Sequence, residues 1–186
     1  MNQQNPIIKI MRLPLILLLS LSIGSLLAQA EYQFPVIKNF GGIYAIDEAT
    51  VVPDATQRYD IVIDVYSGDD PTQLNGALNN VARMINLHVI GGVHPDSIHV
   101  VLAIHGNATK TVLDDDGYVS RYDVKNPNRD LIRELKESGV KLTVCGQSLI
   151  GRKIDLEEVN ENIEIATSML TTVTTYRLKG YTLLRF

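Results

Sequence analysis

The sequence predicts an α/β protein with a mostly parallel sheet and helices on both faces of that sheet. Short apolar runs rich in β-branched residues, typical of strands covered on both faces, recur along the chain. Segments with apolar residues at helical spacing separate most of these runs. The resulting order is β-α-β-α-β-β-α-β, and this alternation favours a parallel sheet over an antiparallel one.

The first thirty residues have the pattern of a secretory signal peptide. Lys9 and Arg12 precede an apolar run from Leu13 to Leu27, and Ala28-Gln29-Ala30 forms a small-x-small cleavage site. An uncleaved N-terminal anchor is the alternative, and Met11 is a second possible start. We expect residues 1–30 to be removed near Ala30. The mature protein would then be periplasmic or secreted, without stable membrane insertion.

Composition limits the classes of partner. The chain has 17 Lys and Arg against 21 Asp and Glu, a formal charge of −4. Removing residues 1–30 takes away two basic residues and no acidic one, so the mature chain has 15 against 21, or −6. An acidic chain without a basic run is a poor candidate for binding nucleic acid or anionic membranes.

The mature chain divides into an N-terminal extension, residues 31–58, and one α/β domain, residues 59–186. Pro35, Gly41-Gly42 and Pro53 interrupt the extension, which we expect to wrap the domain. The domain opens with the β-branched strand Tyr59 to Tyr66. A helix follows, with Asp70 as N-cap and Pro71 at its first position. Its core stripe consists of Leu74, Leu78, Val81 and Ile85, and it ends near Leu87.

The second strand is Ser97 to Ile104. We expect a short helix at 108–112, a turn at 114–117, and a loop or short helix at 118–126. The next helix starts at Asn126, with Pro127 in its first turn, and stops at Gly139. The strand Lys141 to Cys145 follows.

The last part of the chain contains two strands and one long helix. One helical turn capped by Asp155 is expected at 155–160. Asn162 to Ala166 alternates as a short strand. Ser168 to Lys179 is predicted as a helix, although its threonines are poor helix formers and a strand competes there. Tyr181 to Phe186 is the last strand.

The strongest candidate for chemistry is Cys145, which is the only cysteine in the chain. A lone cysteine in an exported protein is buried and inert, joined to another chain, or a free reactive thiol. Cys145 ends an apolar strand, and ligands of open α/β sheets collect outside the carboxyl ends of strands. Backbone N–H groups beyond the strand would stabilise a thiolate. Gly146 would leave room for a ligand, and Gln147 and Ser148 offer hydrogen-bond donors.

A second candidate, His105-Gly106-Asn107, follows the strand that ends at Ile104. It should therefore open on the same edge as Cys145, where His105 could act as a base or counter-cation for the thiol. A histidine that merely bonds a loop carbonyl is the alternative. No acidic residue has an obvious third role in the sequence, so a protease-like arrangement is not predicted.

No metal site or cofactor is predicted. The four histidines form no metal-ligand motif, and Asp114 to Asp116 lack the spacing of a calcium loop. Ser67-Gly68-Asp69-Asp70 is neither a P-loop nor a dinucleotide-binding motif.

Several short motifs, taken together, resemble the exported branch of the DsrE/DsrF-like family over residues 35 to 186. The motifs are Leu78-Asn79-Asn80-Val81-Ala82-Arg83, Ile104-His105-Gly106 with Asp114 downstream, Asn126-Pro127-Asn128, Val144-Cys145-Gly146-Gln147-Ser148 and Gly180-Tyr181. The resemblance implies a three-layer α/β/α domain of flavodoxin-like layout, with a parallel sheet of about five strands. It also implies homotrimers or homohexamers, and sulfur transfer between proteins through a cysteine persulfide. Cys145 matches that cysteine, whereas Asn107 stands where many relatives have proline.

Two functions follow as hypotheses. The first is an exported carrier of sulfane sulfur, at most sulfurtransferase-like, in which Cys145 holds the sulfur and His105 relays a proton. Gly106, Asn107, Gly146, Gln147 and Ser148 would bind the ligand, and a sulfur donor or acceptor protein would be the partner. The second is a non-catalytic ligand-binding or assembly module with a structural cysteine.

Overall fold

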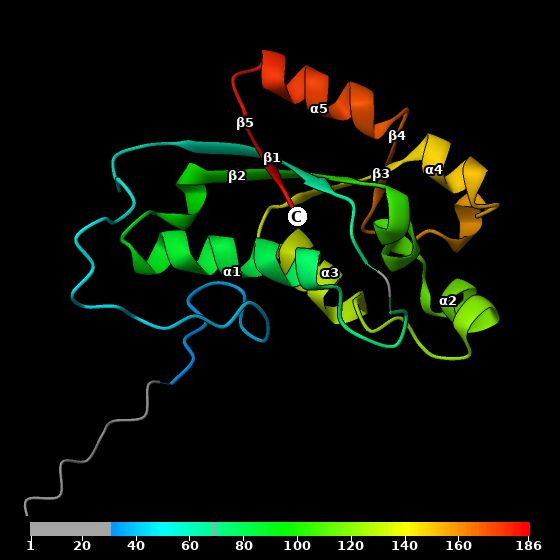
Figure 1. Cartoon of the computed structure of the whole chain (residues 1–186), viewed down its shortest axis with the longest axis horizontal. Helices are drawn as coiled ribbons and strands as arrows, with labels where there is room; N and C mark the ends of the chain where they lie inside the picture. Colours follow the sequence, from blue (N-terminus) through cyan, green and yellow to red (C-terminus); the bar gives the residue numbers. More distant parts are fainter. Residues whose placement is uncertain (1–30, 69) are drawn as a thin grey trace, which may run out of the picture. The chain divides into compact units, whose positions relative to one another are not determined.

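The computed structural model describes residues 31–68 and 70–186, so the predicted signal peptide lies outside the described residues. The described chain forms one compact unit built on a five-stranded sheet in the order β4-β3-β2-β1-β5 (Figure 1). All four pairings are parallel. The strands are β1 (Tyr59–Val65), β2 (Ile98–Ile104), β3 (Lys141–Cys145), β4 (Glu164–Ala166) and β5 (Thr182–Arg185).

Helices cover both faces of the sheet, which confirms the predicted α/β class and its three layers. α1 (Gly76–Ile90) and α3 (Arg129–Glu137) lie on one face, and α5 (Met169–Leu178) lies on the other (Figure 1). This arrangement follows from chain direction. The chain steps from β1 through β4 toward one edge of the sheet and then crosses back to β5. A right-handed crossover in the reverse direction places its helix on the opposite face.

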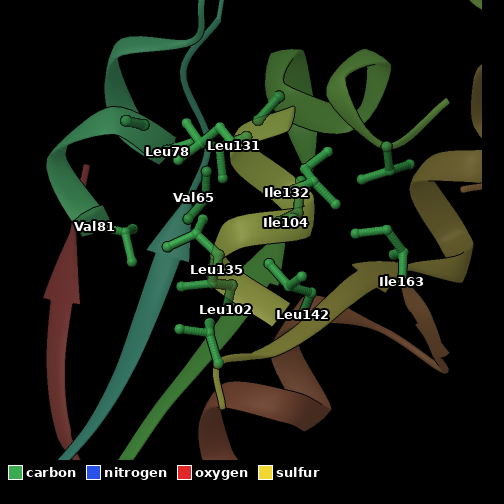
Figure 2. Packing of buried hydrophobic residues seen from close by; sticks show 14 of the residues in the cluster. Val65, Leu78, Val81, Leu102, Ile104, Leu131, Ile132, Leu135, Leu142 and Ile163 are labelled. Atoms are coloured by element: carbon green, nitrogen blue, oxygen red, sulfur yellow. The ribbon is translucent and has the colours of Figure 1, made fainter. Parts of the chain in front are cut away.

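The main hydrophobic core lies between the sheet and the α1–α3 layer. Alternate residues of each strand point to this face. Val65, Leu102 and Leu142 meet Leu78 of α1 and Leu135 of α3 there (Figure 2). All five side chains are fully buried. The core-facing stripe predicted for α1 is therefore confirmed at its two central positions, Leu78 and Val81.

The opposite face is narrower and more polar. Its side chains under α5 include Val62, Ala103, Thr143 and Cys145, all buried. The α5 helix itself buries only Thr172. The buried Thr143 hydroxyl is hydrogen-bonded, because Oγ1 donates to the Leu102 carbonyl at 2.6 Å. The candidate cysteine thus belongs to the thinly covered side of the sheet.

The prediction for the start of α1 was wrong by about one and a half turns. Asp70 accepts from the Thr72 amide and hydroxyl, which closes a local turn instead of a helix. Asn75 is the N-cap, and its Oδ1 accepts from the Leu78 amide at 3.0 Å. The Asn75 amide donates to Asn128 Oδ1, a contact that sequence spacing could not reveal.

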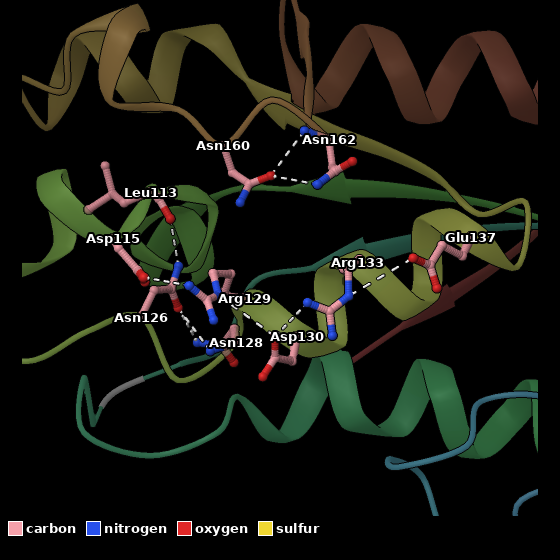
Figure 3. A network of polar contacts seen from close by, with 10 residues as sticks. All are labelled: Leu113, Asp115, Asn126, Asn128, Arg129, Asp130, Arg133, Glu137, Asn160 and Asn162. Atoms are coloured by element: carbon pink, nitrogen blue, oxygen red, sulfur yellow. Dashed lines mark hydrogen bonds and ion pairs between the residues drawn. The ribbon is translucent and has the colours of Figure 1, made fainter.

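Asn126 does not cap α3 as predicted. Its side chain is buried and donates to the carbonyl of Thr111. It also donates to the carbonyl of Leu113, while its Oδ1 accepts from the amide and side chain of Asn128 (Figure 3). α3 begins only at Arg129. The Asn126-Pro127-Asn128 segment therefore joins three loops at the carboxyl edge of the sheet.

The segment predicted as a turn at 114–117 and a loop or short helix at 118–126 contains a helix, α2 (Asp115–Tyr122), which starts inside the predicted turn. Asp114 is its N-cap and accepts from the Gly117 amide at 2.7 Å. Carboxylates in the first turn favour a helix N-terminus, so the acidic run has a structural reason. Asp115 also pairs with Arg129 at 2.8 Å, which ties α2 to α3.

The shorter elements agree better with the sequence prediction. Residues 106–112 and 156–158 form 3-10 turns, the second with Asp155 and Glu158 in a capping box. A third 3-10 turn, Pro95–Ser97, precedes β2. α5 is a helix with Ser168 as its N-cap, so the competing strand is excluded.

Residues 31–58 contain no helix or strand apart from an isolated bridge between Gln33 and Ile43. Ile37 is buried in the core, and Asn86 of α1 holds the segment through its amide and carbonyl groups. Within the described part of the chain, every helix is too short or too polar to span a bilayer.

Candidate functional site

Cys145 lies where three elements meet at the carboxyl edge of the sheet. It is the last residue of β3, pairs with Ala166 of β4, and is the N-cap of the short helix α4 (Gly146–Gly151). The chain enters α4 directly after the strand. Cys145 is 5% exposed, so its sulfur lies just beneath the surface.

Hydrogen-bond donors surround the thiol and lower its pKa. Burial alone raises the pKa of Cys145, but the bonds from the Met169 amide, the Ser148 side chain and amide, and the Gln147 amide together outweigh burial. These amides belong to the first turns of α4 and α5. Because N–H groups at helix N-termini favour negative charge, the site stabilises the thiolate, which is the nucleophilic form of cysteine.

The residues after Cys145 have more specific positions than the sequence indicated. The space beside Gly146 is filled by the Ala166 carbonyl, which would lie 2.9 Å from an added Cβ. Glycine therefore allows β4 to approach the thiol. Gln147 is exposed and donates weakly from Nε2 to the Thr167 carbonyl at 3.5 Å. Ser148 is the side chain that turns toward the sulfur.

His105 directly follows the neighbouring strand, β2, and lies on the same face of the sheet as Cys145. Ile104 pairs with Val144 in the last β2–β3 register position, so His105 and Cys145 each stand one residue further along adjacent strands. The His105 amide donates to the Val65 carbonyl at 3.0 Å, which keeps its backbone extended. Adjacent parallel strands lie about 4.8 Å apart, so the two residues are neighbours across the sheet edge.

The imidazole turns toward β1 and meets a carboxylate that the sequence did not reveal as a partner. His105 Nε2 lies 2.5 Å from Asp64 Oδ1, and both side chains are only 14% exposed. Arg185 Nε lies 3.3 Å from the other oxygen, Oδ2. β1 lies between β2 and β5, so Asp64 stands between the imidazole and the guanidinium. Asp64 is therefore the acidic third group that sequence analysis did not identify.

Tyr66 completes this polar group with an aromatic wall. Its ring centroid is 5.2 Å from that of His105, and the Arg185 guanidinium lies 5.5 Å from its ring centroid. Gly106 has a φ of +57°, and an added Cβ would lie 2.4 Å from the Tyr66 ring. Glycine is thus required at this position by both backbone conformation and the close ring.

Asn107 lies apart from the other predicted site residues. It is exposed, and its Oδ1 accepts from Arg152 Nη2 at 3.2 Å, at the far end of α4 from Cys145. The structure therefore places the predicted residues in three groups. The first surrounds the thiol, the second surrounds Asp64 and the imidazole, and the third contains Asn107 and Arg152.

Two contributors were missed by sequence reasoning for different reasons. Asp64 could have been noticed in the sequence, because it is a carboxylate between the β-branched residues Ile63 and Val65 of a buried strand. The Met169 amide could not have been found, because a backbone donor has no sequence signature and reaches Cys145 only through the fold. Among residues 31–68 and 70–186, no group of three His, Cys, Asp or Glu side chains is arranged to hold a metal ion.

The chain is similar to solved structures, of which one agrees with this architecture. The fold is similar to that of a protein of unknown function, MTH1491 from Methanobacterium thermoautotrophicum, with a TM-score of 0.52 and 15% identity, covering 69% of this chain and 99% of that one. The YchN protein from E. coli has a TM-score of 0.46 and 17% identity, covering 68% of this chain and 99% of that one.

No curated protein matches the sequence. A model of the DsrE/DsrF-like family matches residues 60–186, from the second residue of β1 to the end of the chain. Because this match covers more than half of the chain, including every helix of the described residues and all of the sheet except Tyr59, the chain belongs to the DsrE/DsrF-like family.

Proposed function

We propose that the protein is an exported carrier of sulfane sulfur, with Cys145 Sγ as the carrier atom. The observation that supports this function best is the set of donors around the thiol, which lowers its pKa despite burial. A carrier needs a nucleophilic sulfur to accept an atom and donors to hold the charged product. Membership of a family linked to sulfur relay points to the same chemistry.

The proposed transfer is balanced without an external oxidant or reductant. The Cys145 thiolate attacks the terminal sulfur of a polysulfide or persulfide donor. A new S–S bond forms at Cys145 and the S–S bond of the donor breaks. A persulfide donor leaves as a thiolate, and a polysulfide donor leaves as a polysulfide that is one sulfur shorter. Delivery to an acceptor thiol is the same step in reverse. The amides of Gln147 and Met169 would hold the negative charge in both directions.

His105 would move protons at this edge of the sheet. If the neutral imidazole carries its proton on Nε2, that N–H donates to Asp64 and leaves Nδ1 as an acceptor. Asp64 would then fix both the tautomer and the orientation of the ring, as second-partner carboxylates do for other histidines. In this role His105 takes the proton of the newly formed Cys145 hydropersulfide, which leaves the charged persulfide that the amides hold.

Export and self-association belong to the same proposal. The pattern of residues 1–30 motivates a periplasmic or secreted location, with no role for nucleic acid. Assembly as a homotrimer or homohexamer is supported by apolar side chains that stay exposed in the single chain, among them Leu170 at 67% and Leu178 at 90%. Exposed apolar patches are typical of protein interfaces. A sulfur donor or acceptor protein would be the further partner.

The decisive experiment is mass spectrometry of the intact protein after incubation with inorganic polysulfide. We expect a gain of one sulfur atom that reducing agents remove and that Cys145→Ser abolishes. Because the chain has one cysteine, the adduct has a single possible thiol. Ser138→Ala, which changes an exposed hydroxyl on the opposite layer, serves as the control and should load normally. A folded protein that takes up no sulfur from polysulfide or protein persulfides would refute the proposal.

The low exposure of Cys145 favours one alternative, a binding or assembly module in which the thiol is structural. This alternative predicts that the native protein resists thiol reagents and that Cys145→Ser keeps its oligomeric state. Rapid labelling of the native protein would exclude the structural role.

A further inference from the structure

A cleft with a basic lining opens at the carboxyl edge of the sheet, beside the sites described above. Its volume is about 470 Å³, and Asn107, Lys110, Arg121, Tyr122, Arg152 and Ile154 line it. These residues come from the turn after β2, from α2, and from the end of α4 and the residues that follow it. The lining thus combines three cations, one amide and two partly apolar walls.

The charges in this cleft do not cancel within the described residues. Arg121 Nη2 pairs with Glu158 Oε2 at 2.7 Å, and Lys110 lies close enough to Asp70 to lower the pKa of that carboxyl, after the larger effect of the Thr72 hydrogen bonds. Arg152 differs, because in residues 31–68 and 70–186 it has no carboxylate within ion-pair distance. Its side-chain partner is the neutral amide oxygen of Asn107, at 3.2 Å.

The contact with Asn107 holds the Arg152 guanidinium in place without neutralising it. A guanidinium has five N–H donors, and the bond to Asn107 uses one nitrogen. The remaining donors suit an oxyanion, which arginine binds in a bidentate manner. This local excess of positive charge stands out in a chain whose formal charge is −4.

The place of the cleft in the fold agrees with a ligand site. Asn107 follows β2, and α4 connects Arg152 to the end of β3. In open α/β sheets, ligands bind in the crevice outside the carboxyl ends of the strands. A volume of about 470 Å³ exceeds that of one inorganic oxyanion and falls in the usual range for small-molecule sites.

We propose that this cleft binds a small organic molecule that carries an oxyanion, and that Arg152 is its principal anchor. Arg121 and Lys110 also line the cleft, and Asn107 positions the guanidinium. Tyr122 and Ile154 contact the body of the ligand. The proposal is independent of the sulfur chemistry of Cys145, since α4 spans about 9 Å between the two places.

The test uses inorganic phosphate and sulfate as probes of the oxyanion subsite. Binding is measured by calorimetry on protein produced from the full chain, at constant ionic strength adjusted with chloride. We expect saturable binding that Arg152→Gln weakens about tenfold, because a charged hydrogen bond contributes about 1.5 kcal/mol or more. Asn107→Asp should weaken it similarly, because the new carboxylate would pair with Arg152.

Arg177→Gln is the matched control, since it removes the same charge from an exposed helix position outside the cleft. It should change the dissociation constant less than twofold. Equal weakening by Arg152→Gln and Arg177→Gln would show general charge attraction and overturn the site. A folded protein that binds neither phosphate nor sulfate saturably would overturn it as well. Cys145→Ser should bind both anions normally, so a failure of sulfur loading is distinguishable from a failure here.

Discussion

Removing the Ser148 hydroxyl tests whether hydrogen bonds set the reactivity of the thiol. Ser148→Ala deletes one of the four donors that lower the pKa of Cys145 and leaves the amides of Ser148, Gln147 and Met169 in place. A hydrogen bond to a charged group contributes about 1.5–3 kcal/mol, and one pKa unit corresponds to about 1.4 kcal/mol. We therefore expect Ser148→Ala to destabilise the thiolate by about 1.5 kcal/mol or more, which raises the pKa of Cys145.

The assay is the rate of alkylation by iodoacetamide as a function of pH, followed by intact mass. The rate follows the thiolate fraction, so the midpoint of the profile reports the pKa of the thiol. Limited access to the buried thiol slows the maximal rate of both proteins alike, so the difference between their midpoints reports the loss of the hydroxyl. Because Cys145 is the only cysteine, no other thiol contributes to the signal.

Ser120→Ala is the control, because the Ser120 hydroxyl bonds a helix carbonyl in α2, away from the thiol. Its profile should coincide with that of the unmodified protein. Two results would refute the reasoning. One is an unmodified protein whose midpoint is no lower than about 8.5, the value of a free cysteine. The other is a Ser148→Ala midpoint that does not move.

Three further predictions concern other parts of the fold. Asp64→Asn removes the charged acceptor of the His105 ring, so the ring nitrogen shifts in NMR spectra should change toward the other tautomer or a mixture of both. Asn126→Ala leaves two buried carbonyls and the Asn128 donors unpaired, so urea unfolding should show a loss of about 3 kcal/mol or more. Burial raises the pKa of Tyr118 to about 12, with smaller effects of Tyr122 and Asp70. Because the folded pKa exceeds the unfolded value of 10.0, this contribution to stability is fully present below pH 10 and is lost between pH 10 and about 12, by about 1.4 kcal/mol per pH unit.

Each of these predictions has a control and an outcome that contradicts it. Asp96→Asn, at an exposed carboxylate near His94, should leave the His105 signals unchanged. Asn162→Ala, at a half-buried turn, should cost less than Asn126→Ala, and equal costs would deny the special role of the buried network. Tyr118→Phe should reduce the slope with which the free energy of unfolding, measured with urea, falls above pH 10. An unchanged slope would assign that loss to other groups.

The class of fold was predictable because burial on both faces leaves a clear mark in sequence. β1, β2 and β3 are runs of β-branched and apolar residues, and their predicted limits agree with the structure within one residue. The polar caps were less predictable. Asp70 and Asn126 have the sequence pattern of N-caps, yet their side chains close a turn and join loops instead. Local propensity does not distinguish a cap from a loop anchor, because both roles use the same acceptor.

The candidate site was predictable where chain order alone defines it. Cys145 and His105 end consecutive strands, and consecutive parallel strands place their carboxyl ends at one edge. The partners of these residues were not predictable. Asp64 meets His105 only because β1 and β2 are adjacent in register, and Met169 meets Cys145 only because α5 starts directly after β4.

By itself, the sequence determined the α/β class, the strand that ends in the single cysteine, and the edge on which His105 opens. These features depend on periodicity and chain order, which are local. Tertiary structure decided the chemistry of the edge, because that chemistry depends on distances between residues remote in sequence. Packing of β4 and α5 against β3 brings the donors that lower the pKa of the thiol. The order β2-β1-β5 places Asp64 between His105 and Arg185.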